Sequence, residues 1–194
     1  VLRDGTTTFC WIIRIHRVDD STSCIGGMLF NLWSTPDFGA PMQVDARGRV
    51  YFMVSTDRIV LRRWDGGVIT DVTDENTSVR GFEVLADGGV AVNTSDIRDN
   101  SMRTMVLRDD AAPEVVGGAY SRFMSVFPDG NLYYGFGPSV TRYDTTSRTT
   151  SSWAASASYG EVSSLATTDA GKVFAVCGIS QPGVLARLYP TVAT

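Results

Sequence analysis

The chain has 194 residues, of which 43% are hydrophobic and 20% are charged, and its formal net charge is -4. The high apolar and aromatic content excludes a disordered chain, and no apolar run approaches the roughly 20 residues that a membrane-spanning helix needs. The acidic balance argues against binding to nucleic acid, which requires a basic surface. We therefore expect one domain, or two small ones, with a sizeable buried core.

The first residues carry no targeting signal. Val1 to Gly5 contain no initiator Met, no basic segment and no apolar segment, so a signal peptide, if there is one, lies outside this sequence. Between the possible compartments we favour an extracellular or periplasmic location. Three cysteines are too few for a disulfide framework, and without a CxxC pair they do not predict zinc, so we expect small buried apolar side chains. They are Cys10, Cys24 and Cys177, and the alternative for the first two is a disulfide in an oxidising compartment, which their spacing alone does not show.

Glycine turns recur along the chain at nearly constant spacing. Successive turn glycines are separated by 43, 40, 42 and 41 residues, and the positions four before, two after and four after each glycine are mostly apolar. Since side chains of a strand alternate between its two faces, this pattern predicts two strands around a tight turn in which glycine supplies a positive φ. The turn glycines are Gly5, Gly48, Gly88, Gly130 and Gly171.

Each repeat continues with a third strand and, in the middle three repeats, with a weaker fourth strand. We expect third strands at 59–64, 104–108, 140–143 and 184–189, and fourth strands at 68–72, 113–116 and 149–153. The first repeat has no clear turn after its second strand, so its third strand is either 12–17 or 28–33. No window combines a helical apolar period with helix caps, and the chain is therefore predicted to be all-β.

Four antiparallel strands in about 41 residues are typical of one blade of a β-propeller, whereas a sandwich or a barrel needs no internal repeat. We therefore predict a β-propeller of four-stranded blades, with about five repeats, as a single domain or as part of a longer propeller. A compact five-bladed ring is the alternative to the longer propeller, because an open array would expose strand edges. The expected repeats are 1–41, 42–79, 80–119, 120–160 and 161–194.

Two segments resemble known propeller families. Residues 44–51 resemble the inner-strand and turn motif of NHL-type propellers, and residues 127–135 with 140–144 resemble the repeat of sensor-regulator propellers and of the virginiamycin B lyase family. The resemblance covers most of the chain, 42–190, and implies the propeller fold. It does not imply one activity, because these superfamilies contain binding proteins, sensors, lyases and lactone hydrolases.

Residues suited to catalysis are sparse in this sequence. His16 is the single histidine, it lies in an apolar alternation, and no serine has a GxSxG environment, so we expect no catalytic residues of these types. Acidic residues cluster at 19–20, 71–75, 96–99 and 109–110, and calcium prefers such oxygen ligands. None of these clusters matches a known calcium motif, so we predict solvated loops, no metal site and no cofactor, with calcium as the only cofactor that this chemistry would suit.

Two classes of function stay open. The favoured one is a non-catalytic binding or scaffold propeller that holds a protein or carbohydrate partner on the face built by the loops between the second and third strands and between blades. The alternative is a propeller enzyme, of the lyase or lactone-hydrolase type, that acts on a small molecule or glycan with a metal in the channel. That enzyme would need convergent carboxylates, and we expect only Asp45 and Glu83 on the innermost strands.

The favoured face carries a mixture of arginine, carboxylate and aromatic side chains, as polar ligand sites and protein interfaces do. The candidate binding residues are Asp37, Phe38, Asp57, Arg80, Arg98, Tyr120, Arg122, Phe136, Tyr159 and Glu161.

Overall fold

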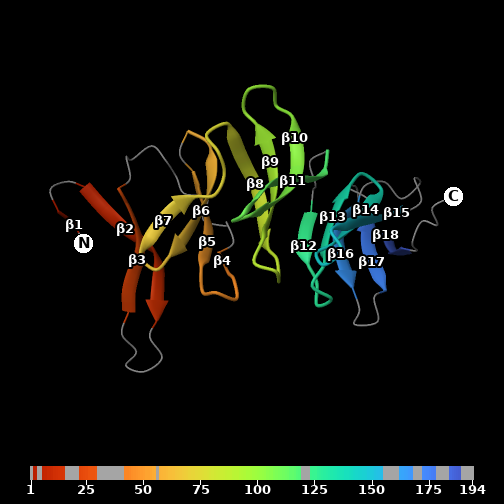
Figure 1. Ribbon diagram of the computed structural model, residues 1–194, viewed down its shortest axis with the longest axis horizontal. Coiled ribbons are helices and arrows are strands. Elements are labelled where there is room, and N and C mark those ends of the chain that lie inside the picture. The colour runs from red at the N-terminus through yellow and green to blue at the C-terminus, as the bar shows by residue number, and fades with distance from the viewer. Residues whose placement is uncertain are drawn as a thin grey trace. The chain divides into compact units, whose positions relative to one another are not determined.

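The computed structural model describes residues 2–3, 6–15, 22–29, 42–55, 57–118, 123–154, 162–167, 172–177 and 184–188. Every regular element in these ranges is a β-strand, which confirms the all-β prediction. Within each sheet the strands lie in sequence order, each antiparallel to the next (Figure 1). The chain divides into two compact units, Val1–Thr77 and Ser78–Thr194.

The first unit holds two sheets. One contains β1 (Leu2–Arg3), β2 (Thr6–Ile15) and β3 (Thr22–Leu29), and the other contains β4 (Gln43–Val44), β5 (Val50–Ser55), β6 (Ile59–Asp65) and β7 (Val68–Asp71). Both predicted positions for the third strand of the first repeat are wrong, because β2 continues to Ile15 and β3 begins at Thr22. The reason is that Thr6–Ile15 is a continuous run rich in β-branched and aromatic residues, without a glycine or proline to end it.

The second unit, together with Thr77, holds three sheets, and the predicted third and fourth strands of these repeats are confirmed. The first sheet contains β8 (Thr77–Val84), β9 (Val90–Asp96), β10 (Met102–Arg108) and β11 (Ala111–Gly117). The second contains β12 (Phe123–Val126), β13 (Leu132–Phe136), β14 (Ser139–Asp144) and β15 (Thr149–Ala154). The third contains β16 (Val162–Thr167), β17 (Val173–Cys177) and β18 (Val184–Leu188).

Three described glycine turns have one geometry, and each joins the first two strands of its sheet. Gly48, Gly88 and Gly130 have φ values of 80, 82 and 77°, which only glycine adopts at little cost. Each glycine N–H donates to the carbonyl three residues earlier, and that earlier residue donates its own N–H to the carbonyl after the glycine. This is a type I turn followed by a glycine bulge, and it confirms the turn that the sequence predicts.

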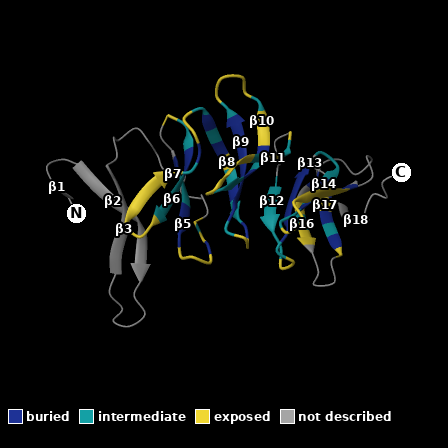
Figure 2. Cartoon of the chain, in the orientation of Figure 1, coloured by how far each residue is buried: buried dark blue, intermediate teal, exposed yellow. Residues whose placement is uncertain are grey.

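Successive sheets of the second unit pack face to face. Tyr134 and Tyr143 of the β12–β15 sheet lie in one buried cluster with Leu85, Ala91 and Val106 of the β8–β11 sheet. The β12–β15 sheet also contributes to a second cluster, which includes Cys177 and confirms the prediction that this cysteine is buried. Figure 2 shows the resulting gradient, in which the second strand of a sheet is buried and the last strand is largely exposed. The members of the second cluster are Tyr133, Val140, Trp153, Val162, Val173, Ala175 and Cys177.

Strand β9 is buried on both faces. Its first three residues are apolar, but Asn93, Thr94 and Ser95 follow at only 4%, 3% and 6% exposure. Asn93 Oδ1 accepts a hydrogen bond of 2.9 Å from Oγ1 of the fully buried Thr104 on β10. A buried polar group costs free energy unless it is hydrogen-bonded. The bond between Asn93 and Thr104 offsets that cost for both side chains in the middle of the sheet.

Two glycines make room for aromatic rings. Phe123 lies directly opposite Gly135 in the β12–β13 pair, and a Cβ on Gly135 would come within 2.5 Å of the ring atom Cζ of Phe123. A Cβ on Gly117 would stand 3.0 Å from Cε2 of Tyr134 in the neighbouring sheet. Tyr134 also donates its hydroxyl hydrogen to the carbonyl of Val116 at 2.5 Å. Gly117 therefore lets the β12–β15 sheet approach β11 closely.

Candidate functional site

Each four-stranded sheet has two ends with different chemistry. In an antiparallel sheet whose strands follow sequence order, the turns after the first and third strands lie at one end, which we call the turn end. The loop after the second strand and the segment that leaves the fourth strand lie at the opposite end, which we call the loop end. The glycine turns at Gly48, Gly88 and Gly130 lie at the turn end of their sheets, and the predicted binding residues were expected at the loop end.

Four of the ten candidate binding residues fall within the described ranges. Asp57 and Arg98 lie in loop-end connections, as expected, whereas Arg80 and Phe136 lie in β8 and β13 rather than in loops. For Arg80 the reason is that buried residues stand on both sides of it in the sequence, Val79 and Phe82, so the surrounding segment is part of the sheet. The other six lie outside the described residues: Asp37, Phe38, Tyr120, Arg122, Tyr159 and Glu161. His16 also lies outside them.

The connection between β9 and β10 forms a well-ordered tip, which we define as residues 96–102. The N–H of Asn100 donates to the carbonyl of Asp96 at 2.8 Å, and Asn100 itself has a φ of 57°. Asp96 also accepts hydrogen bonds from the backbone N–H and the guanidinium of Arg98. The hydrogen bonds from Arg98 are the leading cause that lowers the pKa of Asp96.

Apolar side chains flank this ion pair at the tip. Ile97 and Met102 are 51% and 42% exposed, and the side chain of Arg98 is 68% exposed. The tip therefore presents two apolar groups and one arginine on a backbone that is already fixed, which lowers the entropy cost of binding. Asp57, in the first unit, is also highly exposed and lies 3.7 Å from Nη1 of Arg58.

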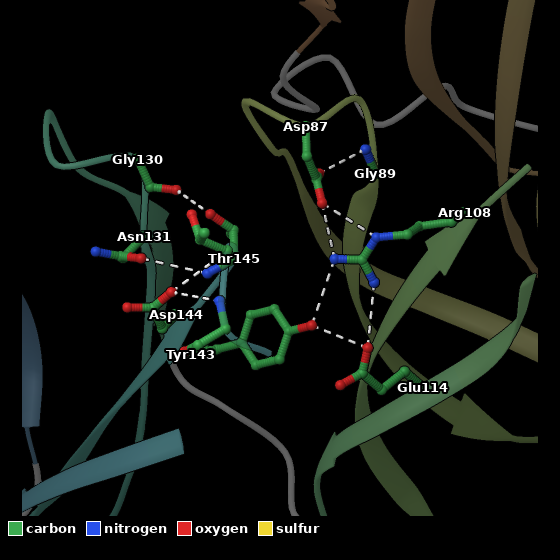
Figure 3. A network of polar contacts seen from close by, with 11 residues as sticks. Asp87, Gly89, Arg108, Glu114, Gly130, Asn131, Tyr143, Asp144 and Thr145 are labelled. Atoms are coloured by element: carbon green, nitrogen blue, oxygen red, sulfur yellow. Dashed lines mark hydrogen bonds and ion pairs between the residues drawn. The ribbon is translucent and has the colours of Figure 1, made fainter. Parts of the chain in front are cut away.

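The turn end of the β8–β11 sheet carries a polar network that the sequence did not predict (Figure 3). Arg108 of β10 donates to Asp87 Oδ2 at 2.8 Å and to Glu114 Oε2 at 3.1 Å. Tyr143 of β14 donates its hydroxyl hydrogen to the same Glu114 oxygen at 2.9 Å and accepts a 3.3 Å hydrogen bond from Arg108. We call these four residues the Arg108 network. It ties a glycine turn and two strands of one sheet to the third strand of the next.

Burial and charge set the protonation states in the Arg108 network. Burial raises the pKa of Tyr143, as does its hydrogen bond to Glu114, whereas the hydrogen bond from Arg108 acts in the opposite direction. Burial would lower the pKa of Arg108, but the hydrogen bonds with Tyr143 and Asp87 outweigh it and raise the pKa overall. These shifts favour a neutral Tyr143 hydroxyl and a cationic Arg108, which match the hydrogen bonds by which the network joins the two sheets.

A second network of polar side chains lies at the turn end of the β12–β15 sheet. Asp129 accepts hydrogen bonds of 2.9 Å from Asn131 Nδ2 and from the Tyr133 hydroxyl. Arg142 of β14 lies 3.9 Å from Asp129 and donates to Asp144 at 3.0 Å. Burial acts to raise the pKa of Asp129, but the hydrogen bonds from Asn131 and Tyr133 outweigh it and lower the pKa. Burial, followed by the bond to Asp129, raises the pKa of Tyr133 to about 12.

In the first unit, Asp45 accepts hydrogen bonds within its glycine turn as Asp129 does, but from other residues. Its Oδ1 accepts 2.9 Å hydrogen bonds from the N–H groups of Arg47 and Arg49, and its Oδ2 lies 2.6 Å from Nε of Arg49. The Arg49 guanidinium lies 5.8 Å from the centre of the Tyr51 ring. Asp45 was expected on an innermost strand, but β4 ends at Val44. The carboxylate of Asp45 instead accepts hydrogen bonds from the backbone of the turn.

A cross-strand pair with arginine recurs in three of the sheets and was not predicted from the sequence. The residue three positions after the turn glycine pairs across the sheet with an arginine in three sheets. The sequence does contain a signal for this pair, because an aromatic residue stands three positions after Gly48, Gly130 and Gly171. The pairs are Tyr51 with Arg63, Tyr133 with Arg142, and Phe174 with Arg187.

The described residues contain no group of three or more histidine, cysteine, aspartate or glutamate side chains placed to hold a metal ion. Within the same ranges no helix has the length and apolar character to cross a membrane.

Among the described residues, antiparallel sheets in sequence order, the same glycine turn in three of these sheets, and face-to-face packing of successive sheets within the second unit define the β-propeller class, and each sheet is one blade. Neither a family model nor a curated protein matches the sequence.

Among solved structures, the chain is similar to a catalytically inactive virginiamycin B lyase of Staphylococcus aureus, solved with quinupristin. The TM-score is 0.53 and the identity 14%, over 91% of this chain and 62% of that chain. The chain is also similar to a protein assigned as a gluconolactonase, with a TM-score of 0.48 and 12% identity, over 89% of this chain and 64% of that chain. This chain thus spans less than two thirds of the length of both neighbours. The likeness to the lyase confirms the propeller fold, including the blade-level resemblance seen in the sequence.

Proposed function

We propose that this propeller is a binding or scaffold module that holds a protein or carbohydrate partner at the loop ends of its blades. One observation carries the proposal: the tip at residues 96–102 is exposed and internally ordered, whereas the polar side chains at the turn ends are engaged with one another. Arg108 and Asp129 illustrate the latter, since each has at least three polar neighbours. Side chains committed to turns and blade contacts have little hydrogen-bonding capacity left for a ligand.

The composition of the tip favours a protein partner over a carbohydrate partner. Exposed Ile97 and Met102 offer apolar area next to Arg98, and methionine and arginine are both enriched at protein interfaces. Backbone hydrogen bonds fix the tip before a partner arrives. Such a surface supports recognition without any chemical step.

The test compares matched variants of the two ends. The immobilised full chain is screened against a glycan array and a displayed peptide library, and each ligand is then measured by surface plasmon resonance. We expect ligands whose binding is lost in the loop-end variant Ile97→Asp/Arg98→Ala and retained in the turn-end variant Arg47→Ala/Asp110→Ala. Ligands that respond only to the turn-end variant would contradict the proposal.

An enzyme is the second candidate, because a structural neighbour is a lyase. The full chain is incubated with quinupristin and with gluconolactone, each with calcium or magnesium and each with EDTA, and the remaining substrate is followed by chromatography. We expect the rates to equal those of buffer under all conditions. Turnover that EDTA abolishes would replace the binding proposal with a metal-dependent enzyme.

A further inference from the structure

Strand β7 forms the outer edge of its sheet and has no neighbour on its far side among the described strands. All four of its residues are exposed, and the exposed fractions of Val68 and Ile69 are 61% and 42%. An edge strand leaves a row of backbone N–H and C=O groups without partners in its sheet and can pair with another extended chain. Aliphatic side chains on such an edge add apolar area to that pairing.

The hydrogen bonds of the sheet identify which groups point outward. The N–H of Val72 donates to the carbonyl of Leu61 on β6 at 2.8 Å. Because the bonded direction alternates along an antiparallel strand, Thr70 and Val68 also direct their N–H and C=O groups toward β6. Ile69 and Asp71 therefore direct theirs away from the sheet, where an added strand would receive them.

The outer strands of the other four-stranded sheets are protected against such pairing. Strand β11 contains Pro113, which has no N–H, and its Glu114 is held by Arg108. Strand β15 begins with four hydroxyl residues, 149–152, and its large apolar residue Trp153 is buried. Proline and polar side chains are common means of blocking edge pairing. Of these three outer strands, β7 alone presents exposed aliphatic residues without a proline.

The chain segment that contains β7 is acidic, whereas the adjoining strand β6 carries Arg62 and Arg63. The segment 65–75, which contains β7, has four carboxylates and no lysine or arginine. Arg62 on β6 forms an ion pair with one of them, its Nε lying 2.8 Å from Asp71 Oδ1. The remaining three, Asp65, Asp74 and Glu75, are exposed. An added strand with lysine or arginine would complement this charge, whereas a second copy of the same edge would bring like charges together.

We propose that the outer edge of β7 binds an extended, cationic segment of a partner protein as an additional antiparallel strand. The outward N–H and C=O groups of Ile69 and Asp71 supply the main-chain hydrogen bonds. Val68 and Ile69 contact apolar residues of the added strand, and the flanking carboxylates select its positive charge. This edge is separate from the tip at residues 96–102, so the inference does not depend on the proposed function.

The probe is the blocked, fluorescently labelled peptide Lys-Val-Lys-Ile-Lys-Val-Lys, and the control is the same peptide with proline at its centre, which carries equal charge. Fluorescence anisotropy with the full chain should show saturable binding of the probe and roughly tenfold weaker binding of the control, since the control loses main-chain hydrogen bonds. Raising the salt concentration from about 50 to about 500 mM should weaken the interaction, because exposed charges are screened.

The decisive variant is Ile69→Pro, which removes one outward N–H and none of the N–H groups that point toward β6. Proline is tolerated on edge strands in this position, so we expect a cooperative melt and a roughly tenfold loss of probe binding. Ile69→Val keeps the N–H and the branched side chain and is expected to bind as the wild type does. Should Ile69→Pro fail to fold, the variant Asp65→Lys/Glu75→Lys takes its place, and it is expected to abolish binding.

Three results would overturn the inference. One is equal binding of the probe and the proline control, which indicates simple charge attraction. Another is full binding by folded Ile69→Pro or, where that variant does not fold, by Asp65→Lys/Glu75→Lys. The third is a wild-type dimer in light scattering that Ile69→Pro makes monomeric, which assigns the edge to a second copy of this chain.

Discussion

Asp45 and Arg49 show how much a single turn depends on one buried ion pair. Their side chains are 0% and 5% exposed, and Asp45 also accepts two backbone hydrogen bonds in the turn. Burial acts to raise the pKa of Asp45, but the hydrogen bonds from Arg49 and Arg47 outweigh it and hold the pKa below its usual value. A carboxyl whose pKa is lowered by folding stabilises the fold above its unfolded pKa and loses that contribution as the pH falls.

We therefore predict that Asp45→Asn destabilises the protein at pH 7 by about 3 to 5 kcal/mol, because it leaves Arg49 buried without its charge partner. The difference from the wild type should shrink below about pH 4, where the carboxyl of the wild type begins to take up protons. Urea unfolding at a series of pH values measures both effects. Asp96→Asn is the control, since its partner Arg98 is exposed, and a loss as large as that of Asp45→Asn would contradict the argument.

The ring of Phe123 occupies the space that a side chain at position 135 would need. We predict that Gly135→Ala lowers the free energy of unfolding by about 1 to 3 kcal/mol, the usual cost of overpacking, since its Cβ would overlap the ring of Phe123. Gly81→Ala on β8 is the matched control, because a Cβ there meets nothing within 4 Å. Chemical denaturation compares the two, and equal effects would show that the ring moves aside at no cost.

At the scale of elements, the Arg108 network joins β10 and β11 of one blade to β14 of the next. Glu114 is the meeting point, since one of its oxygens accepts from both Arg108 and Tyr143. If this bond couples the two blades, removing either partner should have much of the effect of removing both.

We predict a coupling energy of about 0.5 to 3 kcal/mol between Tyr143→Phe and Glu114→Ala in a double-mutant cycle, as is usual for residues in one network. The control cycle pairs Tyr143→Phe with Arg80→Ala, whose arginine is exposed on β8, and should be additive within about 0.5 kcal/mol. Urea unfolding of the single and double variants provides the energies. Additivity in the first cycle would mean that the bond contributes nothing to blade coupling.

The blades were predictable from the sequence, and this network was not, for a physical reason. A strand pair and its turn are local, so the apolar alternation and the turn glycines repeat visibly about every 41 residues. Asp87, Glu114 and Tyr143 come from a turn and two strands of different repeats, and their meeting depends on how two sheets pack. The same limit explains Arg80: its polar neighbours suggested a loop, while buried Val79 and Phe82 place it in β8.

At the scale of the whole molecule, each four-stranded sheet is most buried at its second strand and largely exposed at its outer strand (Figure 2). All but the last residue of β9 are buried, whereas all residues of β7 are exposed. Local opening is easiest where few apolar contacts and many solvent-exposed hydrogen bonds are found. The outer strands should thus open without the rest of their sheets.

Hydrogen exchange measured by mass spectrometry tests this gradient. We predict that peptides from β9 and β13 exchange last and that peptides from β7 and β11 exchange first, because the inner strands open only when the packed sheet does. Comparable protection of β11 and β9, which belong to one sheet, would show that a blade opens as one piece. The peptide from β15 serves as an internal reference, because it is an outer strand that carries a buried tryptophan.

The burial of Asn93 has a consequence for how the protein is produced. Asn93-Thr94-Ser95 fits the acceptor pattern for N-linked glycans, yet Asn93 is 4% exposed and bonded to Thr104 within its sheet. Asn76-Thr77-Ser78 fits the same pattern in a surface turn. A eukaryotic secretory host can attach the sugar before folding, and the buried side chain of Asn93 has no room for it in the folded sheet. Secreted material should therefore carry glycan at Asn76 and none at Asn93, while molecules modified at Asn93 stay unfolded inside the cell.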